Sequence, residues 1–327
     1  MMQKTARKKE GIYTLMINKM KIFKINIKLS ILFLFIIGTT VQAQQEAQFT
    51  QYMYNTISVN PAYAGSRDVL SVIGLYRTQW VGLEGAPKTA TFALHSPVSE
   101  RIGLGFSVVN DRIGPSDENN IAADLSYNIP VSENYRLFFG MKASANILNI
   151  DYTKLDIYNP TDPQYQNNVD RKFSPNIGAG LYLQSDKGYV GLSVPYMLET
   201  RHYNHSTASE AKEKMHYYVI GGYVFDLSST VKFKPAVLTK VVVGAPLQVD
   251  LSANFLFNEK LILGAAYRWD AAVSAMAGFQ ITPGLLAGYA YDLDTTKLGN
   301  YNSGSHEIFL RFELFKNFDK ITSPRFF

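Results

Sequence analysis

The sequence contains no cysteine among its 327 residues. Without a thiol the chain cannot form a disulfide framework, a cysteine-ligated zinc site, an iron–sulfur cluster or a thiol nucleophile, and it cannot carry a lipid on cysteine. Charge is also scarce, since 18% of the residues are Asp, Glu, Lys or Arg, against about 25% in an average soluble domain. Only two tryptophans occur, although 21 Tyr and 20 Phe make the chain rich in aromatics. A hydrophobic share of 46% excludes an intrinsically disordered chain.

No apolar run is long enough for a membrane-spanning helix, which needs about 20 residues. One short run, at 29–38, follows a stretch in which eight Lys and Arg residues accompany a single acid, Glu10. A basic region, a short apolar region and the small residues around Ala43 together predict a secretory signal peptide that is cleaved after Ala43. An amphipathic helix retained at the N-terminus is the alternative.

The formal net charge of +5 belongs to this predicted leader, residues 1–43. Its removal takes away eight basic residues and one acid, which leaves 24 basic and 26 acidic residues and a net charge of −2. The pI near 9.0 would suggest a nucleic-acid partner if the basic residues were retained. Because the exported chain is not basic, we expect no nucleic-acid partner.

Beyond the leader, apolar and polar residues alternate over segments of about ten residues. In residues 121–129, for example, apolar residues occupy the odd positions, and Asp124, Ser126 and Asn128 lie between them. A strand that crosses a bilayer at a tilt needs about 9–11 residues, whereas strands of soluble proteins usually have about 5–6. Fourteen segments of suitable length are predicted as strands: 69–80, 88–96, 101–110, 120–130, 134–147, 173–184, 187–198, 214–226, 229–241, 247–257, 260–269, 271–281, 284–293 and 304–316.

The connections between these segments alternate in length. Short turns are expected at 97–100, 131–133, 185–186, 227–228, 258–259 and 282–283, and long loops at 111–119, 148–172, 199–213 and 294–303. Short turns on one side and long loops on the other are typical of outer-membrane barrels. The sequence therefore predicts an all-β fold, a transmembrane antiparallel outer-membrane β-barrel of about 14 strands at 68–316, with a tail at 317–327. A soluble β-sandwich or propeller is the alternative, and it would have shorter strands and more surface charge.

Charged side chains on the polar phase of the strands are expected to face the barrel lumen. Both signs occur, so we predict salt bridges that fill the interior, with a selective pore lining as the alternative. Since the first and last strands must meet, Arg77 is expected to approach Glu313. The lumen-facing set is Arg77, Asp124, Arg136, Lys142, Lys232, Lys234, Asp250, Arg268, Asp270, Asp292, Arg311 and Glu313.

Residues 44–67, before the first strand, are dense in aromatics, and Asn60-Pro61 and Ala64-Gly65 predict turns. Such composition implies burial, as a plug in the barrel or a pad beneath it, and a flexible periplasmic leader is the alternative. The candidate residues are Gln48, Phe49, Gln51, Tyr52, Asn60, Pro61, Ala62, Tyr63 and Gly65.

Catalytic and cofactor motifs are scarce. Gly191-Leu-Ser193-Val-Pro195 lacks the last glycine of a nucleophile elbow, and no glycine-rich loop precedes a helix. His202 and His205 lie in a predicted loop, where a solvated polar surface is favoured over a metal site. We expect neither an enzyme nor a bound cofactor or metal.

Five short motifs, in this order, resemble the PorP/SprF family. They are Gln48–Asn55, Asn60–Ser66, Arg77-x-Gln79-Trp80, Gly85–Thr89 and Ser323–Phe327. The resemblance implies an outer-membrane protein of the type IX secretion system of Bacteroidota, without catalytic residues. It further implies an accessory that binds, exports or anchors a secreted surface adhesin through the C-terminal domain of that adhesin, in adhesion or gliding. A second branch of the family implies a core component that contacts the periplasmic secretion ring.

The partner surface is expected in the loops 148–172 and 199–213, or in the N-terminal segment. Tyr152, Tyr158, Tyr165 and Tyr203 are candidate contact residues in these loops. Expected partners are the adhesin, secretion components and outer-membrane lipid. A passive diffusion channel is the alternative function, because fourteen strands enclose more space than the smallest barrels.

Overall fold

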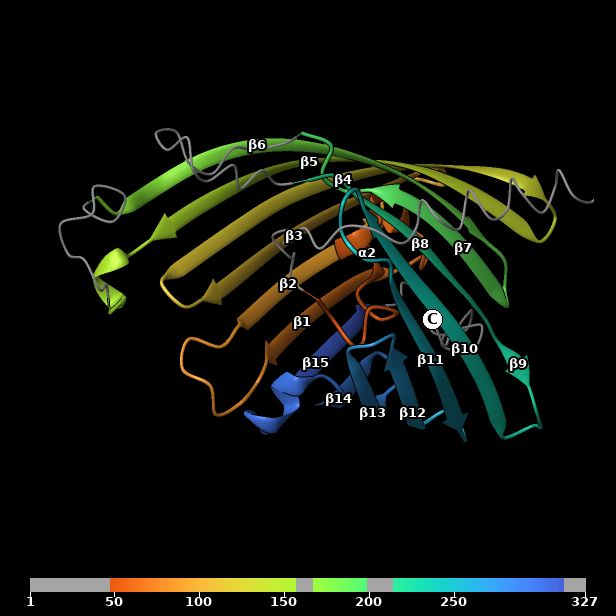
Figure 1. Ribbon diagram of the computed structural model, residues 1–327. Coiled ribbons are helices and arrows are strands. Elements are labelled where there is room, and N and C mark those ends of the chain that lie inside the picture. Colours follow the sequence, from red (N-terminus) through yellow and green to blue (C-terminus); the bar gives the residue numbers. More distant parts are fainter. Residues whose placement is uncertain (1–47, 157–166, 199–213, 315–327) are drawn as a thin grey trace, which may run out of the picture. The chain divides into compact units, whose positions relative to one another are not determined.

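The computed structural model describes residues 48–156, 167–198 and 214–314, all of which belong to one compact unit, residues 43–327 (Figure 1). The predicted leader at 1–43 and tail at 317–327 therefore lie outside the described residues. Within the described ranges, no helix is both long and apolar enough to cross a membrane.

Strands make up most of the described chain. They are β1 (Leu70–Thr78), β2 (Lys88–Pro97), β3 (Ile102–Ile113), β4 (Ser116–Ser132), β5 (Tyr135–Ile150), β6 (Val169–Gln184), β7 (Gly188–Val194), β8 (His216–Tyr223), β9 (Phe225–Asp226), β10 (Val231–Val242), β11 (Gln248–Phe257), β12 (Leu261–Arg268), β13 (Ala272–Thr282), β14 (Leu285–Asp294) and β15 (Ser305–Leu314). Short helices are α2 (Thr56–Val59), η1 (Pro61–Tyr63), η2 (Tyr152–Lys154) and η3 (Lys297–Asn300). Since β8 and β9 both pair with β10 and are separated only by Val224, they are two parts of one strand. The sheet thus has fourteen strands, as the sequence predicts.

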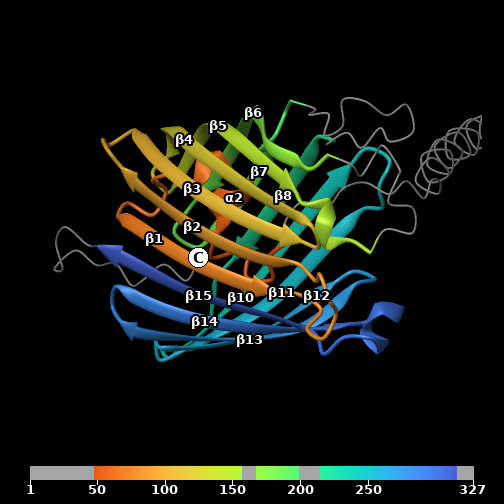
Figure 2. The same cartoon turned by 90° about the vertical axis from the view of Figure 1, so that its left-hand side faces the viewer.

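The sheet closes on itself. Each strand pairs in antiparallel fashion with the next one along the chain, and β1 pairs with β15 from Leu70↔Leu314 to Thr78↔His306. Figures 1 and 2 show the ring of strands from two sides, with α2 inside it. Closure gives the backbone N–H and C=O groups of the first and last strands a partner, which hydrocarbon cannot supply. The predicted closed antiparallel barrel is confirmed.

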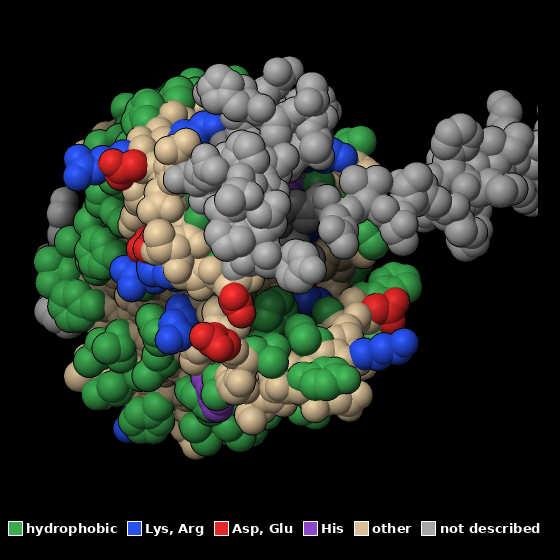
Figure 3. All heavy atoms as spheres, turned by 60° about the vertical axis from the view of Figure 1, so that its left-hand side comes forward, with side chains coloured by type: hydrophobic (Ala, Val, Ile, Leu, Met, Phe, Trp, Pro, Cys, Tyr) green, Lys and Arg blue, Asp and Glu red, His purple; other side chains and the backbone are tan. Residues whose placement is uncertain are grey.

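The two faces of the wall have opposite polarity. Leu125 and Met141 point outward and are 47% and 67% exposed, whereas their neighbours Asp124 and Lys142 point inward and are 2% and 3% exposed. Figure 3 shows broad hydrophobic areas on the face in view, with charged side chains in small groups. Apolar residues outside and polar residues inside are the arrangement of a barrel surrounded by lipid.

The barrel has two different ends. The turn end carries the connections 98–101, 133–134, 185–187, 227–230, 258–260 and 283–284, and the loop end carries 79–87, 114–115, 151–168, 195–215, 243–247, 269–271 and 295–304. The turn end therefore has only short connections, as the sequence predicts.

The predicted long loop at 111–119 is wrong. β3 and β4 continue to Ile113 and Ser116, and only two residues connect them. Asn110 donates to Asp117 at 2.7 Å, and Arg112 pairs with the same carboxylate at 3.0 Å. Polar cross-strand pairs of this kind extend a hairpin into water, where both faces of the ribbon can be hydrophilic. Their polarity resembles that of a loop when it is judged from the sequence alone.

We expect Met141→Arg to destabilise the folded barrel in bilayers by about 2–4 kcal/mol, because it places a cation in the lipid-facing belt. Glu84→Arg, at an exposed position of the loop end, serves as the control and should have little effect. Equilibrium unfolding by guanidinium in phospholipid vesicles measures both. Equal stability of the two variants would contradict the assignment of the outer face to lipid.

Candidate functional site

The lumen is occupied by the chain that precedes β1. We call residues 48–69 the inner segment; it contains α2 and η1, and most of its side chains are buried. Asn60 begins η1, since its side-chain oxygen accepts from the Ala62 N–H at 3.0 Å, and Pro61 stands at the first helical position, where no N–H is needed. The Asn-Pro turn therefore stops α2 and redirects the chain inside the barrel.

Near the loop end, a buried ion cluster holds the beginning of the inner segment. Both carboxylate oxygens of Glu307 accept backbone N–H groups, from Thr50 at 2.9 Å and Gln51 at 2.8 Å. Arg77 bridges Glu307 at 3.1 Å and Asp292 at 2.6 Å, and it also donates to the Thr50 hydroxyl at 2.8 Å. The wall thus binds both the backbone and a side chain of the segment with charge-assisted bonds.

In the middle of the lumen, wall residues donate to the carbonyl groups at the end of α2. The Ser193 hydroxyl bonds to Val59 O at 2.6 Å, and the Asn60 amide donates to Leu181 O at 2.9 Å. Lys142, which pairs with Asp124 at 3.3 Å, reaches Ile57 O at 3.4 Å. The bonds from Ser193 and Lys142 satisfy helix-end carbonyls that would otherwise lack partners, and the bond from Asn60 runs the other way, from the segment to the wall.

A second ion cluster lies near the turn end. Arg67 forms a salt bridge with Glu313 on β15, and Gly65 N–H donates to His95 Nδ1 at 3.1 Å. The side chains of Arg67 and Glu313 are 4% and 6% exposed, so the pair lies in the interior. Asp68 follows and pairs with Arg136 at 2.7 Å. The inner segment crosses the lumen from the loop end to the turn end.

Glycines of the wall provide the space for this segment. A Cβ atom at Gly140 would lie 2.1 Å from Ala62 N, and one at Gly103 would lie 2.3 Å from Ala64 O. A Cβ at Gly180 would lie 2.2 Å from the Asn60 side chain. Because real contacts are essentially never this short, the wall backbone can come this close to the inner segment only at positions that carry no side chain.

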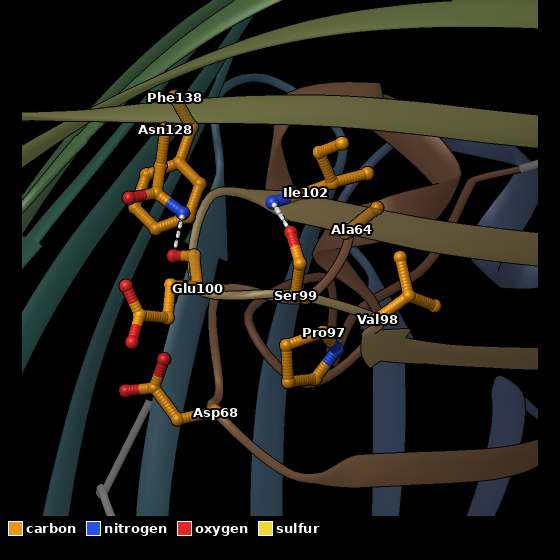
Figure 4. Close-up of a pocket in the computed structure, with 11 residues that line it drawn as sticks. Ala64, Asp68, Pro97, Val98, Ser99, Glu100, Ile102, Asn128 and Phe138 are labelled. Carbon is orange, nitrogen blue, oxygen red and sulfur yellow. Dashed lines mark hydrogen bonds between the residues drawn. The ribbon is translucent and has the colours of Figure 1, made fainter.

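A cavity of about 360 Å³ opens where the inner segment reaches the turn end. Ala64 and Phe138 line it, together with the turn that follows β2. Figure 4 shows the carboxylates of Asp68 and Glu100 pointing to the same side of this cavity, and the Asn128 amide donating to Glu100 O at 3.0 Å.

Comparison with known families agrees with this architecture. The family model described as "Type IX secretion system membrane protein PorP/SprF" matches residues 41–312. The chain belongs to the PorP/SprF family. It is thus an outer-membrane β-barrel of the type IX secretion system, and the predicted family and localisation are confirmed. A search of curated proteins finds no match for this PorP/SprF chain.

Similar solved structures are outer-membrane barrels of low sequence identity. The Omp33 protein of Acinetobacter baumannii is 10% identical, and the match covers 76% of this chain and 100% of that one at a TM-score of 0.45. The CymD monoaromatic hydrocarbon channel is 12% identical, and the match covers 84% of this chain and 94% of that one at a TM-score of 0.47. The KdgM porin is 8% identical, and the match covers 75% of this chain and 99% of that one at a TM-score of 0.38.

The structure corrects two of the predicted lumen charges of this PorP/SprF protein. Arg77 does not approach Glu313, because the register places Arg77 opposite Glu307 and Glu313 opposite Ser71. Asp270 does not face the lumen, since it is exposed in the connection after β12 with a positive φ of 50°.

The other predicted charges lie as follows. Arg268 pairs with Asp250 at 2.6 Å, and Arg311 lies 3.5 Å from Glu313. Lys232 pairs with Glu259 at 3.4 Å near the turn end. The predicted segment residues from Phe49 to Gly65 are all buried, and Gln48 donates to Gln248 at 3.0 Å.

Among the predicted partner residues, Tyr152 is buried in a small cluster with Leu148 and Ile150, so it stabilises the base of the loop. The other three, Tyr158, Tyr165 and Tyr203, lie outside the described residues, as does the histidine pair of the predicted loop. In the part of the chain that the structure describes, no three His, Asp or Glu side chains could hold a metal ion.

Sequence reasoning missed Thr50, Arg67, His95 and Glu307, which complete the two ion clusters. Glu307 has the same strand phase as Arg311, and that phase could have identified it as lumen-facing. Arg67 and Thr50 carry no such signal, because they precede the first strand and follow no strand periodicity.

We expect Gly140→Val to destabilise the barrel by about 1–3 kcal/mol through overpacking against Ala62. Gly74→Val is the matched control, since nothing lies within 4 Å of a Cβ there. Limited proteolysis should cut the inner segment faster in Gly140→Val only. Equal protection from proteolysis in both variants would contradict the close packing of the inner segment against the wall.

The ion cluster at the loop end gives a second test. Arg77→Met leaves Asp292 and Glu307 buried without their cation, which should cost about 3–5 kcal/mol. Arg112→Met removes an exposed pair with Asp117, and its cost should be within about 1 kcal/mol. Denaturant unfolding of the two variants compares them directly, and a similar cost for both would show that the buried cluster does not hold the segment.

Proposed function

We propose that this PorP/SprF barrel binds a secreted surface adhesin, or its C-terminal domain, and exports or anchors it at the cell surface. The proposal rests on the position of the inner segment, which fills the lumen from the loop end to the turn end. A barrel filled in this way works through its surfaces rather than as an open pore.

The packing of the inner segment argues against the passive channel. Tyr52, Met53, Tyr54, Ile57 and Tyr63 are each 5% exposed or less and belong to one cluster with inward-facing apolar wall residues. Burial of such a side chain stabilises by about 1.5–3 kcal/mol, so removing all five costs on the order of 10 kcal/mol. Spontaneous release of the segment would therefore be rare.

The loop end is the surface that we assign to the adhesin. It carries the long connections at 151–168 and 195–215, and it presents Trp269 and Tyr301, which are 57% and 73% exposed. Exposed aromatics of this kind are frequent anchors in protein interfaces. An enzymatic role has no support in the described interior, where charged side chains pair with one another and with the inner segment.

The turn-end cavity favours a second candidate function, a core secretion component that contacts periplasmic ring proteins. Asp68 and Glu100 give its rim two carboxylates, one of them neutralised by Arg136. In an outer-membrane barrel with this orientation, the short turns face the periplasm.

Deletion of the gene distinguishes the two functions. We expect the loss of one large adhesin from the cell surface, with other type IX substrates still secreted, as measured by surface proteomics. A complemented strain is the control. Loss of every substrate of the system would favour the core component and contradict an adhesin-specific accessory.

Replacement of the connection 199–213 by a glycine–serine linker of equal length tests the loop end. We expect it to lower adhesin retention at the surface while the barrel still assembles, because the contact surface is removed and the wall is not. The control replaces 228–230 at the turn end with the same linker chemistry. Normal adhesin retention in the loop-end variant and loss of retention in the turn-end variant would instead assign the partner surface to the turn end.

A further inference from the structure

The outer face of β2, β3 and β4 changes its chemistry in steps towards the loop end. Register partners on neighbouring strands point to the same face of a sheet, so their side chains form rows across the wall. Three successive rows, which we call the apolar row, the amide row and the charged row, are Phe92, Val108 and Ile121; Ala90, Asn110 and Asn119; and Lys88, Arg112 and Asp117. Figures 1 and 2 show these three strands side by side.

The spacing of the rows matches the layers of a membrane. Phe106 and Leu125, further from the loop end on the same face, are 39% and 47% exposed, so the apolar row is the upper edge of the lipid-facing belt. Each step of two residues covers about 7 Å along the strand, or about 5 Å in height at a tilt of about 40°. A headgroup layer is about 5–8 Å thick, so the amide row lies within it and the charged row at its outer edge. Because long loops of such barrels face the outside of the cell, this is the outer leaflet.

The charged row has more positive than negative charge. Arg112 Nε lies 3.0 Å from the Asp117 carboxylate, and the Arg112 side chain is still 64% exposed. Lys88 is exposed directly beside Arg112, and within the described ranges it takes part in no ion pair. Two cations with one carboxylate give the row a net charge of +1. An ammonium and a guanidinium side by side suit a phosphate group.

The amide row is held in place by the charged row. Asp117 Oδ1 accepts from Asn110 at 2.7 Å and from Asn119 at 3.3 Å, and Asn110 also donates to Asn119 Oδ1 at 3.0 Å. On the other side of Asn110 lie the small Ala90 and then Tyr76 of β1, which is 47% exposed. Amides donate and accept hydrogen bonds, and a tyrosine ring offers an apolar face with a hydroxyl at its tip. Sugar rings, which carry hydroxyl groups around an apolar face, need this combination.

We propose that this face binds a phosphorylated glycolipid of the outer leaflet, with phosphate at Lys88 and Arg112, the sugar along the amide row and acyl chains on the apolar row. A membrane lipid fits all three rows because the apolar row lies in hydrocarbon. A glycerophospholipid has no sugar between its phosphate and its acyl chains, so it would leave the amide row without a ligand. The site lies on the wall, apart from the adhesin surface, and does not depend on the proposed function.

The test uses the purified full-length chain in nanodiscs of phosphatidylcholine. Because the chain has no cysteine, Ala123→Cys introduces a single fluorophore one row below the apolar row, and Ala265→Cys on β12 is the matched control at another exposed position of the wall. Three lipids are compared: lipid A with its phosphates, the same glycolipid without phosphate, and phosphatidylglycerol. Each carries a nitroxide on an acyl chain, which quenches a fluorophore close to it.

We expect phosphorylated lipid A to quench the fluorophore at 123 more strongly than either other lipid, and the fluorophore at 265 to show no such preference. Lys88→Met should lower the relative affinity for lipid A at 123 about fivefold, since a cation beside an anionic headgroup contributes roughly this factor. Lys88→Arg should keep the preference, and so should Lys260→Met, which removes an exposed lysine at the turn end.

Three results would each overturn the proposal. The same preference at 265 as at 123 would show that lipid A has no local site. Equal quenching at 123 by lipid A and phosphatidylglycerol would show that the face recognises charge without a sugar. An unchanged preference in Lys88→Met would remove the phosphate contact. Far-UV circular dichroism of every variant confirms that the barrel is folded, as expected for a substitution at an exposed position.

Discussion

Backbone polar groups have no partner in hydrocarbon, and this constraint determines the architecture of the chain. An open strand edge at β1 or β15 would leave a row of N–H and C=O groups unsatisfied, so the first and last strands must pair. Closure with this wall polarity places charged and polar side chains in the interior, where they need hydrogen-bond partners and opposite charges. The inner segment supplies part of these partners. Its backbone amides donate to Glu307, and its carbonyl groups accept hydrogen bonds from Ser193 and Lys142.

The inner segment and the wall therefore depend on each other. Glu307 and Asp292 face the lumen as buried carboxylates, and they are satisfied by Arg77 from the wall and by Thr50 from the segment. Gly140 and Gly103 have no side chain, and this lets the backbone of η1 and of the residues after it lie close to the wall. A sequence that changed one partner without the other would leave a buried charge or a steric clash.

Period-two alternation was sufficient to predict the fourteen strands, the closed barrel and the short turns, because lipid enforces one polarity on every second residue. It failed at 111–119, since a hairpin in water has no apolar face and resembles a loop. Alternation could assign Arg77 to the lumen but not its partner, because a shift in strand register of a few residues exchanges Glu313 for Glu307. The contacts of Thr50 and Arg67 could not be predicted, as they depend on how a non-periodic segment crosses the interior.

The inner segment closes the lumen of this PorP/SprF barrel. Single-channel recording in a planar bilayer tests it most directly, with the full chain compared with a variant in which residues 48–66 are replaced by a short flexible linker. We expect no stable conductance for the full chain and a steady ohmic pore for the variant. A stable ohmic pore formed by the full chain would contradict it.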